Sequence, residues 1–236
     1  MILDSAESIE YLRRKGLHLD LSAHVVSKVI ARYDLFNRIV HLPGDIIECG
    51  VYRGASLFLW ASLLEIFAPT TQRKVVGFDT FDGFGPNMAL GCDRSSAENL
   101  MSRSGQFCPR TRDEVMDTAK SLSLDKRIEL VAGDATATIP EYVKKSPGLR
   151  VALINLDFDV YDPTIAALRS LYPKLVPGGV VTFDQYGARE WGESDAADQF
   201  FGPMGVNLES IPWASSPQAF VVKNGAPADK TANDSA

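Results

Sequence analysis

The sequence predicts an α/β protein whose mostly parallel sheet carries helices on both faces. Short apolar runs alternate with segments of helical periodicity, the order expected of strands joined by crossover helices. A glycine-containing turn follows the first predicted strand, and acidic residues stand at the ends of the predicted strands. Ligands of such sheets bind beyond the carboxyl ends of the strands, so both features mark the expected site.

Length and composition are those of a globular α/β chain. The 236 residues are 45% hydrophobic and 23% charged, with a formal net charge of −6. This charge gives no basic field for a phosphate backbone, which argues against nucleic acid as the main partner. Cys49, Cys92 and Cys108 fit neither a disulfide framework nor a zinc site, so we expect reduced thiols and a cytoplasmic location.

The first predicted element is an amphipathic helix over residues 21–41, whose apolar residues recur three and four positions apart. We therefore expect a helical cap over 1–41, followed by the main domain over 42–223. The polar segment 224–236 is expected to be a disordered tail. Residues 1–20 lack the apolar core of a signal peptide, and no apolar run reaches 18 residues, so neither a leader nor a membrane span is expected.

Strands and helices then alternate. The predicted strands are 45–51, 74–80, 127–134, 150–159 and 179–186, and the predicted helices are 56–68, 112–124, 139–146 and 163–175. Pro177-Gly178-Gly179 is expected to close the last of these helices. Residues 210–223 resemble a hairpin, which completes a seven-stranded sheet with a late antiparallel strand.

Residues 82–111 show no clear periodicity. A segment of this length inside a compact domain is usually a lid, a binding segment or a disordered loop. We expect a lid over the site, and a flexible surface loop remains the alternative.

The turn after the first strand predicts a nucleotide-like ligand. Gly50 can form a tight turn and Gly54 can let the next helix pack closely. Tyr52 replaces the glycine that a dinucleotide pyrophosphate requires, which counts against NAD or FAD. S-adenosylmethionine has no phosphate and makes no such demand. An ordinary strand–helix turn is the alternative.

Two strand-end carboxylates fit the adenosine part of that ligand. Asp79 suits the two ribose hydroxyls, and Asp134 could accept a hydrogen bond from the adenine amino group. Each could instead be a helix N-cap. Their occurrence together with the glycine turn favours S-adenosylmethionine as the cofactor.

Several motifs carry a family resemblance. G-V-Y-R-G-A-S at 50–56 resembles the cofactor turn of catechol O-methyltransferase-type enzymes. Five further motifs resemble the macrocin O-methyltransferase family. They are L-P-G-D-I-I-E-C-G-V-Y-R-G at 42–54, F-D-T-F-D-G-F at 78–84, L-D-F-D-V-Y at 156–161, A-L-R-S-L-Y-P-K-L-V-P-G-G at 167–179 and F-D-Q-Y at 183–186. The likeness covers roughly residues 30–190.

This resemblance implies a Rossmann-like class I methyltransferase fold and transfer of a methyl group to a sugar or glycoside hydroxyl. A deoxysugar of natural-product or surface-glycan biosynthesis is the expected acceptor, with Mg²⁺ as a second cofactor and a homo-oligomeric state. It assigns Tyr52 and Ser56 to the methionine end of the cofactor. The whole expected cofactor set is Glu48, Gly50, Tyr52, Arg53, Gly54, Ser56, Asp79, Asp134 and Asp157.

The resemblance also implies a metal site at Asp157, Asp184 and Gln185. Magnesium prefers hard oxygen ligands and keeps several waters, so two carboxylates and one amide oxygen suffice. Gln185 departs from the Asp of the sugar branch and matches the amide of catechol-type enzymes. The alternative is that the two carboxylates are satisfied by neighbouring backbone N–H groups.

The general base is the weakest part of the resemblance. Sugar-branch relatives have a late His, whereas His18, His24 and His41 all precede the cofactor turn. Catechol-type enzymes have a Lys where this chain has Val160. Asp159 is the candidate base, with no role in proton transfer as the alternative. Trp191 and Glu193 could line the acceptor pocket or lie in a solvated loop.

Three other functions stay open at this stage. A catechol-type methyltransferase would act on a phenol with adjacent hydroxyls. An oxidoreductase would bind NAD, against which Tyr52 counts. A binding or scaffolding protein would keep the fold without turnover.

Overall fold

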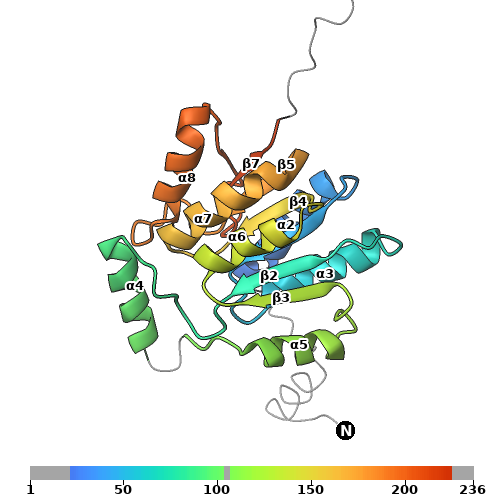
Figure 1. Ribbon diagram of the computed structural model, residues 1–236, viewed down its shortest axis with the longest axis horizontal. Coiled ribbons are helices and arrows are strands. Elements are labelled where there is room, and N and C mark those ends of the chain that lie inside the picture. Colours follow the sequence, from blue (N-terminus) through green and yellow to red (C-terminus); the bar gives the residue numbers. More distant parts are fainter. Residues whose placement is uncertain (1–21, 104–106, 225–236) are drawn as a thin grey trace, which may run out of the picture.

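The computed structural model describes residues 22–103 and 107–224, which form a central sheet between two helical layers (Figure 1). The strands are β1 (Asp45–Cys49), β2 (Val75–Asp79), β3 (Ile128–Ala132), β4 (Val151–Leu156), β5 (Leu175–Phe183), β6 (Glu209–Ser210) and β7 (Ala219–Val222). Their order is β3-β2-β1-β4-β5-β7-β6. The first five run parallel, whereas β7 is antiparallel to both β5 and β6. The predicted fold class is therefore confirmed, and β7 is the late antiparallel strand.

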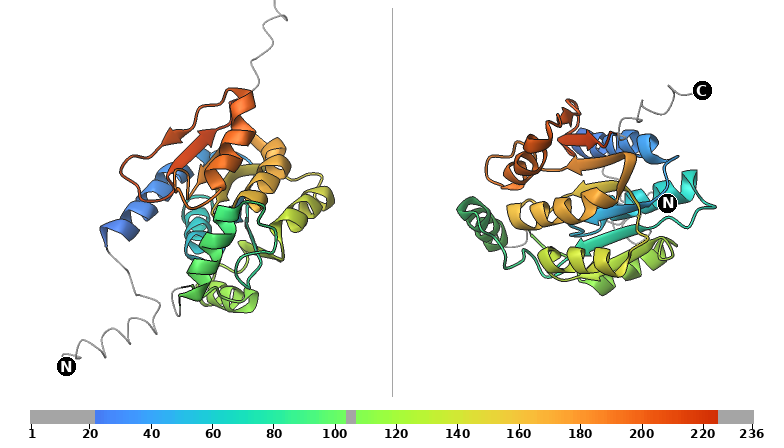
Figure 2. Two further views of the ribbon diagram at one scale, coloured as in Figure 1. Left: turned by 90° about the vertical axis from the view of Figure 1, so that its left-hand side faces the viewer. Right: turned by 45° about the horizontal axis from the view of Figure 1, so that its top comes forward.

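Helices cover both faces of the sheet (Figure 2). One face packs against α2 (Ala23–Ile39), α3 (Ala55–Phe67) and α5 (Arg112–Ser121). The other packs against α6 (Ala135–Lys145), α7 (Tyr161–Leu171) and α8 (Glu193–Phe201). The six residues of β4, V-A-L-I-N-L, are all buried. A continuous buried run of this kind is expected of a parallel strand covered on both sides.

Helix α2 follows the predicted amphipathic pattern. Its N-cap Ser22 accepts a hydrogen bond from the Val25 N–H. The buried residues of this helix are Ala31, Arg32, Leu35, Phe36 and Ile39. Their spacing places them on one helix face, which packs on the sheet. Arg32 is the one charged residue of that buried set.

One expectation about secondary structure is wrong, and one segment contains a helix that its sequence pattern does not indicate. Pro177-Gly178-Gly179 lies inside β5 rather than after a helix, and the preceding helical turn is a short 3₁₀ segment at Tyr172–Lys174. Gly178 has a φ of +80°, and the pairing of β4 with β5 shifts register near this point. The glycines thus allow an irregularity within a strand. The supposedly aperiodic segment 82–111 contains α4 (Gly91–Ser102).

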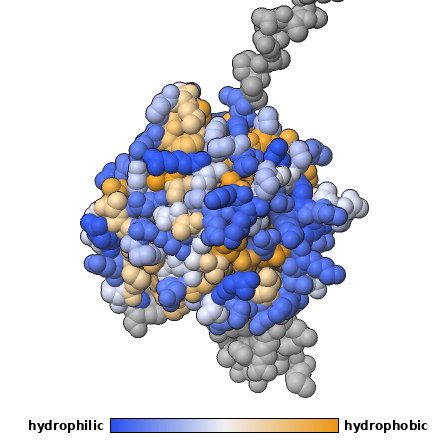
Figure 3. Space-filling model, in the orientation of Figure 1, coloured by the Kyte–Doolittle hydropathy of each residue, from blue (hydrophilic) through white to orange (hydrophobic). Residues whose placement is uncertain are grey.

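The boundaries of the predicted cap, domain and tail stay predictions. Residues 1–21 and the tail from 225 onward lie outside the described residues, and α2 packs directly on the sheet. Within residues 22–103 and 107–224, no helix has the length and apolar character to cross a bilayer. The face in Figure 3 is largely hydrophilic, with small apolar areas between the polar ones.

Candidate active site

A pocket of about 390 Å³ opens at the carboxyl ends of the parallel strands. It is lined by the turn after β1, the ends of β2 to β5 and residues 80–87, here called the 80s loop, together with Leu100 of α4. Helix α4 stands on the side of the sheet where these strands end (Figure 1). A pocket of this volume falls in the range that holds a drug-sized ligand.

The turn after β1 depends on Gly50. This residue has a φ of +94°, and a Cβ added to it would lie 2.0 Å from the carbonyl oxygen of Asp157. Only glycine permits both this conformation and this close approach. Gly54 has a φ of +87° and is the N-cap of α3, where a Cβ would meet the ring of Phe58.

Asp79 holds the same turn from the end of β2. Its Oδ2 accepts the N–H groups of Val51 (2.7 Å) and Tyr52 (2.8 Å), and its Oδ1 accepts the Phe81 N–H (2.8 Å). Asp79 also lines the pocket. The carboxylate therefore shapes the turn and retains a position suited to ribose hydroxyls.

Asp134 caps a helix and also lies in the pocket. It is the N-cap of α6, accepting the Thr136 N–H at 2.9 Å, and it lines the pocket. The side-chain amide of Asn87 donates to its Oδ2. Asn87 thereby connects the 80s loop to the predicted adenine end of the site.

Four aromatic rings from separate segments stack in a row beside the pocket. Tyr52 stacks on Phe107 at 5.2 Å, Phe107 on Phe84 at 5.1 Å, and Phe84 on Trp191 at 5.4 Å between ring centroids. Tyr52, Phe84 and Phe107 line the pocket, whereas Trp191 does not. The stack connects the cofactor turn, the 80s loop and the segment after β5.

Four residues of the expected cofactor set do not line the pocket, namely Glu48, Arg53, Gly54 and Ser56. Glu48 is fully buried and accepts hydrogen bonds from Ser56 Oγ and from Trp60 Nε1 at 3.0 Å. Burial raises the pKa of Glu48 to about 7. Arg53 is exposed. The structure thus separates a lining group (Gly50, Tyr52, Asp79, Asp134 and Asp157) from a supporting one.

The other end of the pocket is a cluster of carboxylates. Asp157 and Asp159 follow β4, and Asp184 and Gln185 follow β5, and all four line the pocket. Burial first, then the carboxylates of Asp184 and Asp159, raise the pKa of Asp157 well above its ordinary value. Like charges held this close favour either a bound proton or a cation. The oxygen donors also suit Mg²⁺.

The described residues contain no group of three or more His, Cys, Asp or Glu side chains arranged to hold a metal ion. The set expected from the sequence has a different composition, because it consists of two carboxylates and one amide. Its oxygens share one pocket, and the carboxylates repel one another. By donor type and by charge, these residues fit a divalent cation.

Asp159 has a left-handed backbone conformation within this cluster. Its φ is +65°, a conformation that non-glycine residues adopt mainly where surrounding structure imposes it. Burial and the carboxylate of Asp184 raise the pKa of Asp159 to about 7, whereas its hydrogen bond with the Gln185 side chain opposes the rise. The side chain thus lies among the predicted metal ligands.

Glu193 does not line the pocket but contacts the residues of this cluster. It is fully buried, and its Oε1 accepts the Gln185 N–H at 2.7 Å. Its own N–H donates to the Asp159 carbonyl at 3.2 Å. Burial raises the pKa of Glu193 well above its ordinary value.

Sequence reasoning missed two cations that α2 brings to the cluster. Lys28 lines the pocket, and its charge opposes the rise in the pKa of Asp159. One turn later, Arg32 Nη2 lies 3.0 Å from Asp184 Oδ1, with both side chains buried. An arginine on the apolar face of an amphipathic helix was the available signal, because a buried charge requires a partner.

Sequence reasoning also missed the residue that holds α4 in place. Asp93 is fully buried, and its two oxygens accept the N–H groups of Gly192 (2.7 Å) and Tyr161 (2.8 Å). Ser96 adds a hydrogen bond to the Glu190 carbonyl at 2.8 Å. The α4 part of the predicted lid is therefore tied to the segment after β5 and to the start of α7.

Comparisons with known proteins identify a family and a similar relative. The model of the macrocin O-methyltransferase (TylF) family matches residues 34–207. The 8-demethyl-8-(2,3-dimethoxy-alpha-L-rhamnosyl)-tetracenomycin-C 4'-O-methyltransferase of Streptomyces olivaceus is 29% identical over 169 residues, which cover 70% of this chain and 61% of that protein. The chain thus matches about three fifths of the length of this relative.

Two solved structures of O-methyltransferases superpose on this chain. The apo structure of CalS11, a TDP-rhamnose 3'-O-methyltransferase of calicheamicin biosynthesis, superposes with a TM-score of 0.68 at 26% identity, covering 94% of this chain and 88% of that one. The structure of the O-methyltransferase NovP superposes with a TM-score of 0.72 at 23% identity, covering 92% and 88%. The latter likeness supports the fold alone.

Proposed function

Because this chain belongs to the macrocin O-methyltransferase family, we propose that it transfers the methyl group of S-adenosylmethionine to a hydroxyl of a sugar or glycoside. The observation that carries this proposal is the shared pocket at the strand ends, in which adenosine-type partners and a carboxylate cluster lie at opposite sides. A methyl donor and a hydroxyl acceptor need adjacent sites of these two kinds.

The donor would lie over the turn after β1. Gly50 would border the ligand, Asp79 would accept from ribose hydroxyls, and Asp134 with Asn87 would border the adenine. The aromatic stack that includes Tyr52 and Phe107 would exclude water from the methyl group. Positioning of the acceptor oxygen, methyl carbon and sulfur in line is the main demand of this reaction.

The acceptor would lie over the carboxylates. Asp157, Asp184 and Gln185 would hold Mg²⁺, which when bound would ease loss of the proton from the acceptor hydroxyl. Asp159 lies within the same cluster, and we assign it as the group that takes this proton. Glu193 would keep the Gln185 backbone in place through its 2.7 Å hydrogen bond.

A sugar acceptor is supported by the relatives, whose names specify a rhamnosyl group and TDP-rhamnose. The amide at Gln185 keeps a phenol with adjacent hydroxyls as the second candidate. A homo-oligomeric state and a cytoplasmic location also remain proposals, the former open to light scattering of the purified protein.

The test is transfer of a labelled methyl group from S-adenosylmethionine to three acceptors: TDP-rhamnose, a rhamnosylated aglycone and a catechol. We expect transfer to one of the sugars, and a catechol-only product would instead establish the phenol activity. Asp157→Ala should lower kcat by at least about 100-fold while S-adenosylhomocysteine still binds. Full activity of the wild type in excess chelator would overturn the metal assignment.

A further inference from the structure

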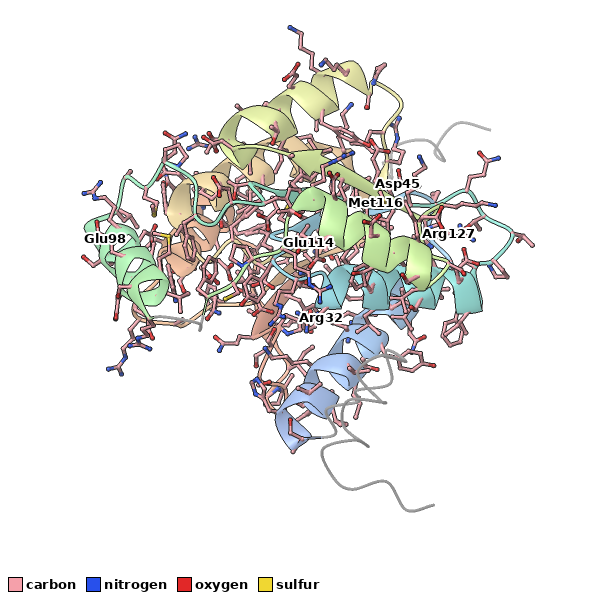
Figure 4. All side chains as sticks on the ribbon, turned by 90° about the horizontal axis from the view of Figure 1, so that it is seen from below. Arg32, Asp45, Glu98, Glu114, Met116 and Arg127 are labelled. Carbon is pink, nitrogen blue, oxygen red and sulfur yellow. The ribbon has the colours of Figure 1, made fainter. Side chains whose placement is uncertain are left out.

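The carboxylate cluster contains a cation of its own. Arg32 is 5% exposed and Asp184 is 7% exposed, and a 3.0 Å ion pair joins them. Arg32 is labelled in Figure 4, where α2 meets the rest of the molecule. Its partner Asp184 lies 152 residues later in the sequence, at the end of β5. Burying an arginine has a large desolvation cost, so specific interactions must compensate for it.

The contacts of Arg32 fix one oxygen of Asp184. Arg32 Nη2 donates to Asp184 Oδ1, and Ser216 Oγ donates to the same oxygen. The guanidinium also donates to Ser216 Oγ at 3.3 Å and to the Ser216 carbonyl at 3.4 Å. The described residues provide no hydrogen bond to Asp184 Oδ2, which leaves that oxygen for a ligand of the pocket.

The guanidinium of Arg32 directs most of its donors at Asp184 and Ser216. The Nε–H of Arg32 is buried without a hydrogen-bond partner among the described residues. For comparison, the guanidinium of Arg127 donates to Glu65 and to four backbone carbonyls, and Arg127 does not line the pocket. The charge of Arg32 faces the carboxylate cluster, since it pairs with Asp184 at 3.0 Å and opposes the rise in the pKa of Asp157.

We propose that Arg32 is the resident cation of the carboxylate cluster: it holds Asp184 through Oδ1, directs Oδ2 to the pocket and lowers the affinity of the site for a divalent metal. This inference rests on the proposed function, in which Asp184 is a metal ligand. Two like charges a few ångströms apart in a partly desolvated site oppose each other strongly. Gln185 in place of a carboxylate acts in the same direction, since it supplies no negative charge.

Arg32 is a positioning residue in this scheme, and its charge has a consequence that a merely structural role would lack. Replacing it with a neutral residue should tighten metal binding, even though the protein becomes less stable. Replacing it with lysine should keep the affinity near that of the wild type, because the charge stays while the planar two-pronged geometry is lost.

The experiment titrates Mn²⁺ into the full-length protein saturated with S-adenosylhomocysteine, with free Mn²⁺ measured by electron paramagnetic resonance. We expect Arg32→Gln to bind Mn²⁺ about tenfold more tightly than the wild type and Arg32→Lys to stay within about threefold. Arg38→Gln is the matched control, because Arg38 is an exposed arginine of the same helix that packs over the Phe220 ring at 5.0 Å.

The outcomes separate this inference from the proposed function. Unchanged or weaker Mn²⁺ binding by Arg32→Gln, or a tenfold change in Arg32→Lys, overturns it. If Arg32→Gln fails to fold, Arg32→Met takes its place as the neutral variant, with the same expected tightening. Binding by Arg32→Gln in the absence of wild-type binding supports the inference, and no binding by either overturns it. Binding of S-adenosylhomocysteine reports on the methyl-donor site independently of every one of these results.

Discussion

At the scale of the residue, Gly50 is the position where fold and site coincide. A Cβ there would lie 2.0 Å from the Asp157 carbonyl oxygen, and the φ of +94° disfavours any other residue. Gly50→Ala should therefore destabilise the protein by about 2 kcal/mol or more in urea denaturation and weaken S-adenosylhomocysteine binding. Gly148→Ala is the control, because a Cβ there has no atom within 4 Å. Equal stability of the two variants would contradict this account.

Glu48 gives the protein a pH-dependent stability. Burial raises its pKa from 4.5 to about 7, so the folded protein binds this proton more tightly than the unfolded chain. Its contribution to stability is therefore greatest below about pH 4.5 and is lost as the pH rises to 7. Between these two values, each further pH unit lowers the free energy of unfolding by up to about 1.4 kcal/mol.

Glu48→Gln removes this titration while keeping a hydrogen-bonding side chain beside Ser56 and Trp60. We expect the variant to gain stability relative to the wild type between about pH 5 and about pH 8, measured by urea denaturation at both values. Glu209→Gln, at an exposed position in β6, serves as the control. A stability difference between Glu48→Gln and the wild type that does not change with pH would refute the role of burial.

At the scale of the element, the sequence predicted most strands because a parallel strand buried on both faces must be apolar throughout, as V-A-L-I-N-L of β4 is. It misplaced Pro177-Gly178-Gly179, because the same residues that end a helix also allow an irregularity in a strand. It missed α4, in which Asp93 and Ala97 are the buried residues. Too few apolar positions are buried there to generate a helical pattern in the sequence.

Asp93 makes α4 a part of the site rather than a loose loop. Its two hydrogen bonds, to Gly192 and Tyr161, are each made by a fully buried carboxylate. Asp93→Asn replaces one acceptor oxygen with an amide that faces an N–H group, at a cost of about 1–3 kcal/mol. We expect faster amide exchange across α4 and weaker S-adenosylhomocysteine binding by about three- to tenfold.

Hydrogen exchange measured by mass spectrometry would test this prediction. Asp113→Asn is the control, because that side chain is 91% exposed at the start of α5. If α4 in Asp93→Asn exchanged at the wild-type rate, the helix would be held by contacts other than this carboxylate.

At the scale of the whole molecule, the sequence could place the carboxylates together because parallel strands end at one edge. Asp79, Asp134, Asp157 and Asp184 do meet at the pocket. It could not place Lys28 and Arg32 there, because the packing of α2 against β5 depends on tertiary contacts that no local pattern encodes. The sequence therefore predicted the acidic residues of the site but not the two basic residues that face them.

The pocket also draws on both halves of the sheet, from Asp134 after β3 to Gln185 after β5. A ligand that binds this folded arrangement alone must stabilise the whole chain by mass action. S-adenosylhomocysteine at about 100 times its dissociation constant should add about 2.7 kcal/mol, or roughly 5–10 °C in Tm for a protein of this size. NAD at the same concentration should leave Tm unchanged, because Tyr52 stands where a pyrophosphate needs glycine. A larger shift with NAD than with S-adenosylhomocysteine, measured by differential scanning fluorimetry, would remove the basis for a methyl donor in this pocket.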